Sequence, residues 1–181
     1  MFRRYKFFII PFAALFFLSA GHFLYLFLFS NFHPITDGKA YRSAQMSSKK
    51  LENHIQKYGI RSVLNLRGEE GNSPWYQDEI KVSEKNRVAH YSVRLSAERE
   101  PSPQDVQKLM AVFKEAPQPI LIHCNAGSDR AGLVAAMWKV VVDKEPKSEA
   151  EKQLSLWFGH LPFGKTHAMN RFFSKWNPEP N

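Results

Sequence analysis

Cysteine is nearly absent from this sequence, which has one thiol, Cys124, in 181 residues. A single cysteine has no partner within the chain for a disulfide bond and no second thiol with which to build a zinc cluster. The sequence also has no cluster of metal-ligating residues and no strip of interleaved basic and aromatic residues. A disulfide scaffold, a metal site and a nucleic-acid interface are therefore poor interpretations, which leaves Cys124 a role in packing or in reactivity.

Acidic residues are outnumbered, because 17 Asp and Glu stand against 25 Lys and Arg and give a formal net charge of +8. This balance favours anionic partners such as phosphorylated substrates, lipid headgroups or nucleic acid, and the sign alone does not choose among them. The chain is too short for two ordinary domains and, at 44% hydrophobic residues, too apolar for disorder. We expect one compact domain over residues 31–181.

Charged residues are missing from residues 7–29, a run of 23 residues without Asp, Glu, Lys or Arg. At about 1.5 Å per residue, such a helix reaches roughly 34 Å, enough for a hydrocarbon core of about 30 Å. Arg3, Arg4 and Lys6 precede the run, and positive residues favour the cytoplasmic side. We therefore expect residues 1–30 to form a cytoplasmic stub and one transmembrane helix in the cell membrane, with the domain outside the cytoplasm, periplasmic in a bacterium. A cleaved signal or a buried helix is the alternative.

The remaining residues alternate between strand-like and helix-like patterns. Apolar runs predict strands at residues 60–66, 88–95 and 118–124, and a short strand after the turn at Asp37–Gly38. Helical spacing and capping residues predict helices near 48–58, 74–85, 104–114, 130–142, 148–158 and 166–176. This alternation indicates an α/β domain with a mainly parallel central sheet flanked by helices. Ligands gather at the carboxyl ends of such strands, and Cys124 lies at one of these ends.

The stretch HCNAGSDRAG (residues 123–132) follows that strand and leads into a helix. Unpaired backbone N–H groups of the turn and of the first helical turn form a cradle for an anion, and the helix dipole adds positive potential. The same potential favours the thiolate form of Cys124, which is the nucleophilic form of the side chain. Arg130 supplies a planar fork for two oxygens of a phosphoryl group. We expect His123 to orient the turn through a hydrogen bond.

His-Cys, five residues and then Arg resembles the signature of the cysteine-dependent tyrosine and dual-specificity phosphatases. The segments AYRSAQ, VLNLRGE, PILIHCNAGSDRAG and MWKVVVDKEPKSEAEKQL are similar to small bacterial periplasmic dual-specificity phosphatases, over about residues 37–163. The resemblance implies hydrolysis of a phosphate monoester through a cysteinyl-phosphate, without a metal or an organic cofactor. It implies that Cys124 is the nucleophile, that Arg130 clamps the phosphate, and that the loop residues Asn125, Ala126, Gly127, Ser128 and Asp129 bind it.

Two departures from the family pattern bear on catalysis. Many relatives carry Ser or Thr directly after the arginine, where this chain has Ala131. The family's general acid is usually an Asp on a separate loop, and the corresponding loop here, SAEREPS, has no Asp. Glu98 is our preferred acid; Asp129 is the rival, since an Asp before the arginine occurs in phosphoinositide phosphatases of the myotubularin type. Glu100 and Asp105 are weaker candidates.

Arginines near the strand ends are candidates for the mouth of the pocket. They are Arg42, Arg67, Arg94 and Arg99, of which Arg67 is the best placed because it directly follows a strand. A phosphoprotein substrate rests on the family likeness, whereas a phospholipid or phosphoinositide substrate is suggested by the expected anchor, the positive charge and the Asp129–Arg130 pair. A phosphate-binding pseudophosphatase is a further alternative, because of Ala131 and the missing loop Asp.

Overall fold

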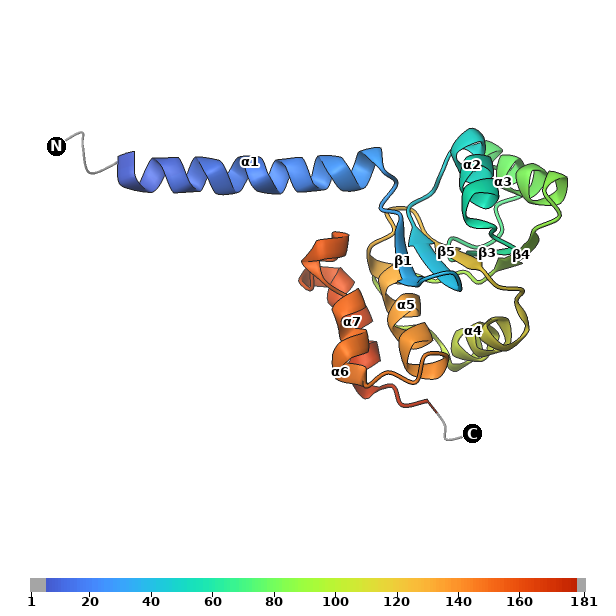
Figure 1. Ribbon diagram of the computed structural model, residues 1–181. Helices are drawn as coiled ribbons and strands as arrows, with labels where there is room; N and C mark the ends of the chain where they lie inside the picture. Colours follow the sequence, from blue (N-terminus) through green and yellow to red (C-terminus); the bar gives the residue numbers. More distant parts are fainter. Residues whose placement is uncertain (1–5, 179–181) are drawn as a thin grey trace.

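A five-stranded sheet forms the centre of the domain in the computed structural model, which describes residues 6–178, with side chains from residue 14 onward (Figure 1). The strands are β1 (His33–Thr36), β2 (Ala40–Ser43), β3 (Ser62–Asn65), β4 (Ala89–Ser92) and β5 (Ile120–His123). Their order is β1-β2-β5-β3-β4; β2, β5, β3 and β4 run parallel, and β1 pairs antiparallel with β2. The predicted α/β fold with a mainly parallel sheet is confirmed.

Helices cover both faces of this sheet (Figure 1). The helices of the domain are α2 (Ser48–Tyr58), α3 (Pro74–Lys85), α4 (Pro103–Glu115), α5 (Asp129–Val141), α6 (Lys147–Ala150) and α7 (His167–Lys175). Successive side chains of a strand point to opposite faces, so in β5 Ile120 and Ile122 join the core formed with α4, α5 and α7. Leu121 joins the smaller core on the side of α2 and α3. A strand buried on both faces fixes the position of the residue that follows it, Cys124.

Local signals set the end of α2 and the beginning of α4. Helix α2 ends at Gly59, whose φ of 62° lies in the left-handed region that favours glycine. Helix α4 begins at a capping box, in which Ser102 and Asp105 each accept a hydrogen bond from the other's backbone N–H. Asp105 is therefore occupied as a helix cap, which removes it from the candidates for the general acid.

The predicted helix over residues 148–158 is wrong. Helix α6 is followed by two short 3₁₀ turns, Glu151–Gln153 and Leu156–Phe158, with a break at Leu154. The reason is a tertiary contact, because the Gln153 carbonyl accepts a hydrogen bond of 2.7 Å from the Arg42 guanidinium. Strand β1 was not expected either, since Pro34 lies in its middle, a residue that strands tolerate at a sheet edge.

Helix α1 (Lys6–Leu28) projects away from the domain (Figure 1). Large apolar side chains along its described part are exposed, among them Phe16, Phe17 and Phe27. Near the domain, Leu26 is buried and the ring of His22 lies 5.4 Å from that of Trp157. Within the part of the chain that the structure describes, no helix combines the length and the apolar character needed to cross a membrane, so the transmembrane prediction is unsupported.

Candidate active site

Four parallel strands bring their carboxyl ends to one edge of the sheet. Ser43 of β2, His123 of β5, Asn65 of β3 and Ser92 of β4 stand in register at that edge. Cys124 directly follows β5, which lies between β2 and β3. The thiol is therefore at the centre of the edge where the sequence predicted a site, and its side chain is buried.

The loop from Cys124 to Arg130 turns its carbonyl groups outward. The carbonyl of Asn125 accepts the backbone N–H of Gln45 at 3.1 Å, and that of Ala126 accepts the side-chain amide of Asn31 at 3.0 Å. In a planar trans peptide, the C=O and the following N–H point in opposite directions. Donors outside the loop that hold the carbonyls therefore turn the next N–H groups toward its interior, which builds the predicted anion cradle.

Arg42 completes this arrangement from behind the loop. Its Nη2 donates to the carbonyls of Gly127 at 2.8 Å and Ser128 at 3.0 Å. The side chain is fully buried, and burial lowers the pKa of Arg42 to about 9, although the nearby Cys124 and Asp129 act to raise it. The interpretation of Arg42 as a residue at the mouth of the pocket is wrong, because its guanidinium supports the loop from the interior.

Gly127 is required by the path of the loop. Its φ is 72°, and a Cβ at this position would lie 2.6 Å from the backbone N of Ala44 and from the backbone C of Ser43. The Gly127 N–H points to the thiol and lies 3.2 Å from Cys124 Sγ. The loop backbone therefore contacts the sulfur directly.

The Arg130 side chain extends from the first turn of α5 toward the ends of β3 and β4. Its Nη1 lies 3.4 Å from the carbonyls of Leu66 and Leu95, both of which are long contacts. Its Nε is buried without a hydrogen-bond partner among the described residues. A guanidinium with unused donors beside the cradle has the capacity to bind phosphoryl oxygens, as the motif predicts.

His123 is oriented by a residue that the sequence did not single out. Its Nε2 lies 3.1 Å from the buried Glu79 carboxylate, which also binds Nε2 of His90 at 2.8 Å. Burial alone raises the pKa of Glu79, but the hydrogen bonds from His123 and His90 outweigh it and hold that pKa well below its usual range. The expected hydrogen bond of His123 thus goes to α3 and not to the turn. Glu79 shares the buried side of α3 with Val82 and Ser83, and an acidic residue on an apolar stripe was the available signal.

Arg67 lies at the position predicted for it, after β3. Its guanidinium stacks on Trp75, 3.6 Å from the ring centre, and its Nη1 donates to Gln45 at 3.2 Å. Burial is the main reason that its pKa is lowered; the negative charge of Glu70 opposes this, and the positive charge of Arg130 adds to it. Arg67 is thus a second cation near the cradle, whereas Arg94 is exposed and bound to Glu70.

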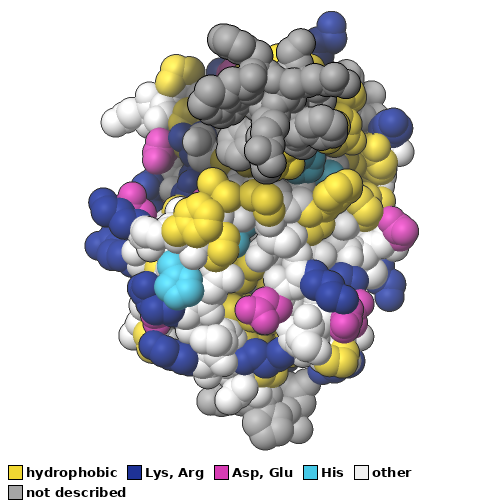
Figure 2. Space-filling view, turned by 90° about the vertical axis from the view of Figure 1, so that its left-hand side faces the viewer, with side chains coloured by type: hydrophobic (Ala, Val, Ile, Leu, Met, Phe, Trp, Pro, Cys, Tyr) yellow, Lys and Arg dark blue, Asp and Glu magenta, His cyan; other side chains and the backbone are white. Residues whose placement is uncertain are grey.

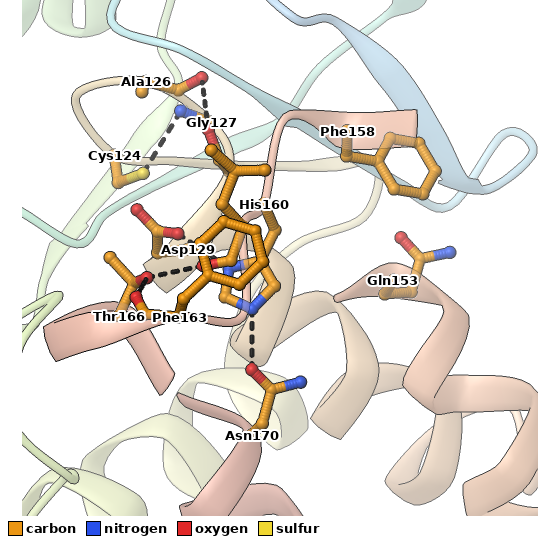
Figure 3. A network of polar contacts seen from close by, with 12 residues as sticks. Cys124, Ala126, Gly127, Asp129, Gln153, Phe158, His160, Phe163, Thr166 and Asn170 are labelled. Carbon is orange, nitrogen blue, oxygen red and sulfur yellow. Dashed lines mark hydrogen bonds and ion pairs between the residues drawn. The ribbon is translucent and has the colours of Figure 1, made fainter. Parts of the chain in front are cut away.

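The candidate acids differ sharply in their surroundings. The Glu98 side chain is 56% exposed and pairs with Lys165 at 3.1 Å, and Glu100 pairs with Arg171 at 3.2 Å. Asp129 is the first residue of α5, and its Oδ1 lies 2.7 Å from Nδ1 of the fully buried His160. Figure 3 shows the Asp129 carboxyl group between Cys124 and His160. No local pattern marked His160 in the sequence, because its contact with Asp129 spans 31 residues.

A cysteine at the end of a central parallel strand, an anion cradle and an arginine at the start of the next helix define a cysteine-dependent phosphatase of the dual-specificity type. The family model for the DSP-PTPase phosphatase fused to NAD+ kinase matches residues 31–168, and the chain belongs to this family. The predicted phosphatase activity and the predicted family are confirmed. A search of the curated proteins finds no match.

Solved structures share this fold. TpbA of P. aeruginosa is 21% identical, with a TM-score of 0.61 over 81% of this chain and 85% of that one. A variant of TpbA was solved in complex with pTyr. The core catalytic domain of the PP-IP phosphatase SIW14 from S. cerevisiae is also 21% identical, with a TM-score of 0.67 over 82% of this chain and 86% of that one. At such identities the likeness establishes a common fold.

Proposed function

We propose that this chain hydrolyses phosphate monoesters with Cys124 as the nucleophile and Arg130 as the phosphate clamp. The observation that carries the proposal is the loop itself. Outside donors hold its carbonyls, and the N–H of Gly127 points to the Cys124 sulfur. A dianionic phosphoryl group seated there would meet backbone N–H groups, the dipole of α5 and the Arg130 guanidinium.

The reaction proceeds in two displacements. The Cys124 thiolate attacks phosphorus, the S–P bond forms as the ester P–O bond breaks, and the electron pair leaves with the ester oxygen, which takes a proton from the general acid. Water then attacks the cysteinyl-phosphate and gives a proton to the carboxylate that remains. The S–P bond breaks, and phosphate and the thiolate are released.

For the general acid, the geometry supports Asp129 better than Glu98. Asp129 belongs to the cradle, and its Oδ2 makes no hydrogen bond within the described residues. Glu98 is more than half exposed and is engaged by Lys165, so a loop movement would have to bring it to the substrate. We therefore propose Asp129 as the acid. The sequence-based preference for Glu98 stays a prediction that only kinetic measurements test.

The nucleophile is tested by Cys124→Ser in the full-length protein. We expect no measurable hydrolysis of p-nitrophenyl phosphate, because a serine hydroxyl stays protonated near neutral pH. Retained protection against thermal unfolding by inorganic phosphate is also expected, because the cradle is unchanged. Turnover near the wild-type level would exclude covalent catalysis through Cys124.

We propose phosphotyrosine-type phosphoproteins as the substrate class, with phospholipid as the second candidate. The family membership and the pTyr complex of TpbA support the first. Exposed apolar side chains at Leu156, Trp157, Leu161 and Phe163 favour the second, since such a surface suits contact with lipid. Apolar side chains gather on the face toward which α1 projects (Figure 2).

The two substrate classes are separated by the double substitution Trp157→Ser and Phe163→Ser. If lipid is the substrate, the double variant loses activity on phosphoinositide vesicles and keeps its activity on a phosphotyrosine peptide. If phosphoprotein is the substrate, the wild type prefers the peptide and the double variant retains that preference. Equal loss on both substrates would point to damage to the fold, which the thermal unfolding of the variant checks.

We also propose that the N-terminal helix holds the domain at the cell membrane, with the catalytic domain on the extracytoplasmic side. The supporting observations are the run of residues 7–29 without charged side chains, the exposure of Phe16 and Phe17, and the positive residues before the run.

A further inference from the structure

His160 is a buried histidine whose two ring nitrogens both contact polar side chains. Its side chain is completely buried, and it lies just after the 3₁₀ turn Leu156–Phe158, on the side of α5 where the cradle ends. Both ring nitrogens are engaged: Nδ1 lies 2.7 Å from Asp129 Oδ1, and Nε2 lies 2.7 Å from Asn170 Oδ1 of α7. Figure 3 shows these contacts, which lead from Asn170 of α7 through His160 to Asp129.

The position of the imidazole is fixed by its surroundings. Gly159, with a φ of 76°, turns the chain so that the His160 backbone N–H donates to the carbonyl of Ser155 at 3.1 Å. A neutral imidazole has one ring hydrogen, so Nε2 must accept a hydrogen bond if Nδ1 is to donate to Asp129. The Asn170 amide provides the donor through its NH2 group, which a half-turn of the amide brings to the position beside Nε2. Asn170 itself is held by α7, which packs its buried residues Ala168 and Met169 into the main core.

We propose that His160 is a positioning residue for Asp129, with Asn170 fixing the imidazole. His160 holds Oδ1 through Nδ1, which directs Oδ2 toward the oxygen of the leaving group. This inference rests on the proposed function, because it assumes that Asp129 is the general acid.

The hydrogen bond between His160 and Asp129 becomes stronger as the proton is transferred. When the P–O bond breaks, the proton on Asp129 Oδ2 moves to the leaving oxygen, and Asp129 becomes a carboxylate. The hydrogen bond from His160 Nδ1 to Oδ1 becomes charge-assisted and therefore stronger at that moment. In the second displacement the carboxylate recovers a proton from the attacking water. An interaction that strengthens as charge develops lowers the barrier of the first displacement more than it stabilises the resting enzyme.

The experiment compares phenyl phosphate, whose leaving group needs a proton, with p-nitrophenyl phosphate, whose leaving group needs much less. Removal of a general acid costs about 10² to 10⁴ in rate when the proton is needed. For His160→Leu we expect a loss of about 10- to 100-fold in kcat on phenyl phosphate and a much smaller loss on p-nitrophenyl phosphate. His160→Asn keeps a donor near the position of Nδ1 and should recover most of this selective loss.

Three further comparisons separate positioning from a purely structural role. Asp129→Asn combined with His160→Leu should be no worse on phenyl phosphate than Asp129→Asn alone, since His160 acts only through Asp129. His167→Leu, the same change at an exposed histidine on the same segment, should leave both activities at the wild-type level. Asn170→Asp offers Nε2 only acceptors and so draws the ring hydrogen away from Nδ1. Asn170→Asp and Asn170→Leu should therefore both show a milder form of the selective loss, which gives a result even if His160→Leu fails to fold.

Different results would overturn the role of His160 and the role of Asp129 as the acid. A selective loss in Asp129→Asn together with an equal loss on both substrates in the His160 and Asn170 variants overturns the role of His160 and leaves Asp129 as the acid. Additive losses in the double variant do the same. If Asp129→Asn shows no selective loss of kcat on phenyl phosphate and Glu98→Gln does, Asp129 is not the general acid. The role proposed for His160 then fails as well.

Discussion

Residues that never touch the phosphate decide the shape of the loop that binds it. Asn31 and Arg42 hold three of the loop carbonyls from outside. Gly127 lets the chain pass against the backbone of Ser43 and Ala44. The reactive residues Cys124 and Arg130 are therefore only as effective as the scaffold behind them, because a cradle of N–H groups depends on where the peptide planes point.

Gly127→Ala should damage both activity and stability. The new Cβ would lie 2.6 Å from backbone atoms and the residue would keep a φ near 72°, so the loop must shift. We expect a loss of about 10²-fold in kcat, the scale of a misplaced catalytic group, and a destabilisation of about 1–3 kcal/mol. Steady-state kinetics and urea unfolding measure the two effects.

Gly38→Ala is the matched control. Gly38 also has a positive φ of 69°, in the turn between β1 and β2, but a Cβ there would meet no atom within 4 Å. This variant should lose about 1 kcal/mol of stability and keep full activity. If Gly127→Ala behaves like Gly38→Ala, the close approach to Ser43 and Ala44 has no part in shaping the site.

At the level of single residues, the phosphate-binding motif could be predicted from the sequence because its residues lie close together in the chain. Cys124 and Arg130 are six positions apart, and their spacing at a strand-to-helix change carries the chemistry. Arg42 was placed wrongly at the mouth of the pocket and His160 was not singled out, because each acquires its role through contacts across 31 to 111 residues. The sequence around a buried arginine also does not distinguish it from an exposed one, because the carbonyls that compensate its charge belong to other segments.

At the level of elements, local patterns predicted most of the fold. Helix α3 begins at Pro74 and ends at Lys85, as predicted, because proline favours the first turn of a helix and the apolar spacing continues to that end. The segment 148–158 failed because the Gln153 carbonyl is bound by Arg42 and not by a helical N–H. Intrinsic helical preference is a weak term, and one buried charged hydrogen bond is enough to override it.

Glu79 links α3 to β5, and it should make stability depend on pH. Its pKa in the folded protein lies below the ordinary value of 4.5, so the unfolded chain binds the proton more readily as the pH falls. Its contribution is therefore present above about pH 4.5 and is lost at lower pH. Glu79→Gln should lower the free energy of unfolding by about 1–3 kcal/mol at pH 7.

The difference between wild type and Glu79→Gln should shrink as the pH falls below that value, which urea unfolding at a series of pH values would measure. Glu84→Gln, at an exposed position on the same helix, should leave the pH profile unchanged. A constant difference between wild type and Glu79→Gln across the acid range would show that the carboxylate charge contributes nothing.

At the scale of the whole molecule, a compact domain carries a projecting helix with exposed phenylalanines. Exposed apolar surface of this extent is unfavourable in water, which is why we propose a membrane as its partner. The run of residues 7–29 was visible in the sequence, whereas its location in a cell depends on partners that a single chain does not contain.

We expect the full-length protein to sediment with membranes, and a reporter fused after Asn181 to be active only outside the cytoplasm. The physical reason is the position of Arg3, Arg4 and Lys6 before the apolar run. Moving these three positive charges to the far side of the run, with the total charge unchanged, should reverse the reporter signal. Recovery of the wild-type protein in the soluble fraction would contradict the proposed attachment.

The long-range contacts around the loop also affect the order in which the protein acquires activity during synthesis. Arg42 reaches Gly127 across 85 residues and Gln153 across 111, and the Asn31 amide joins Ala126 to Phe158. Closing such large loops is entropically costly and tends to come late in folding. A nascent chain that has emerged only as far as Arg130 therefore has its nucleophile and its clamp but no finished cradle, and the enzyme becomes competent only after residue 158 has left the ribosome.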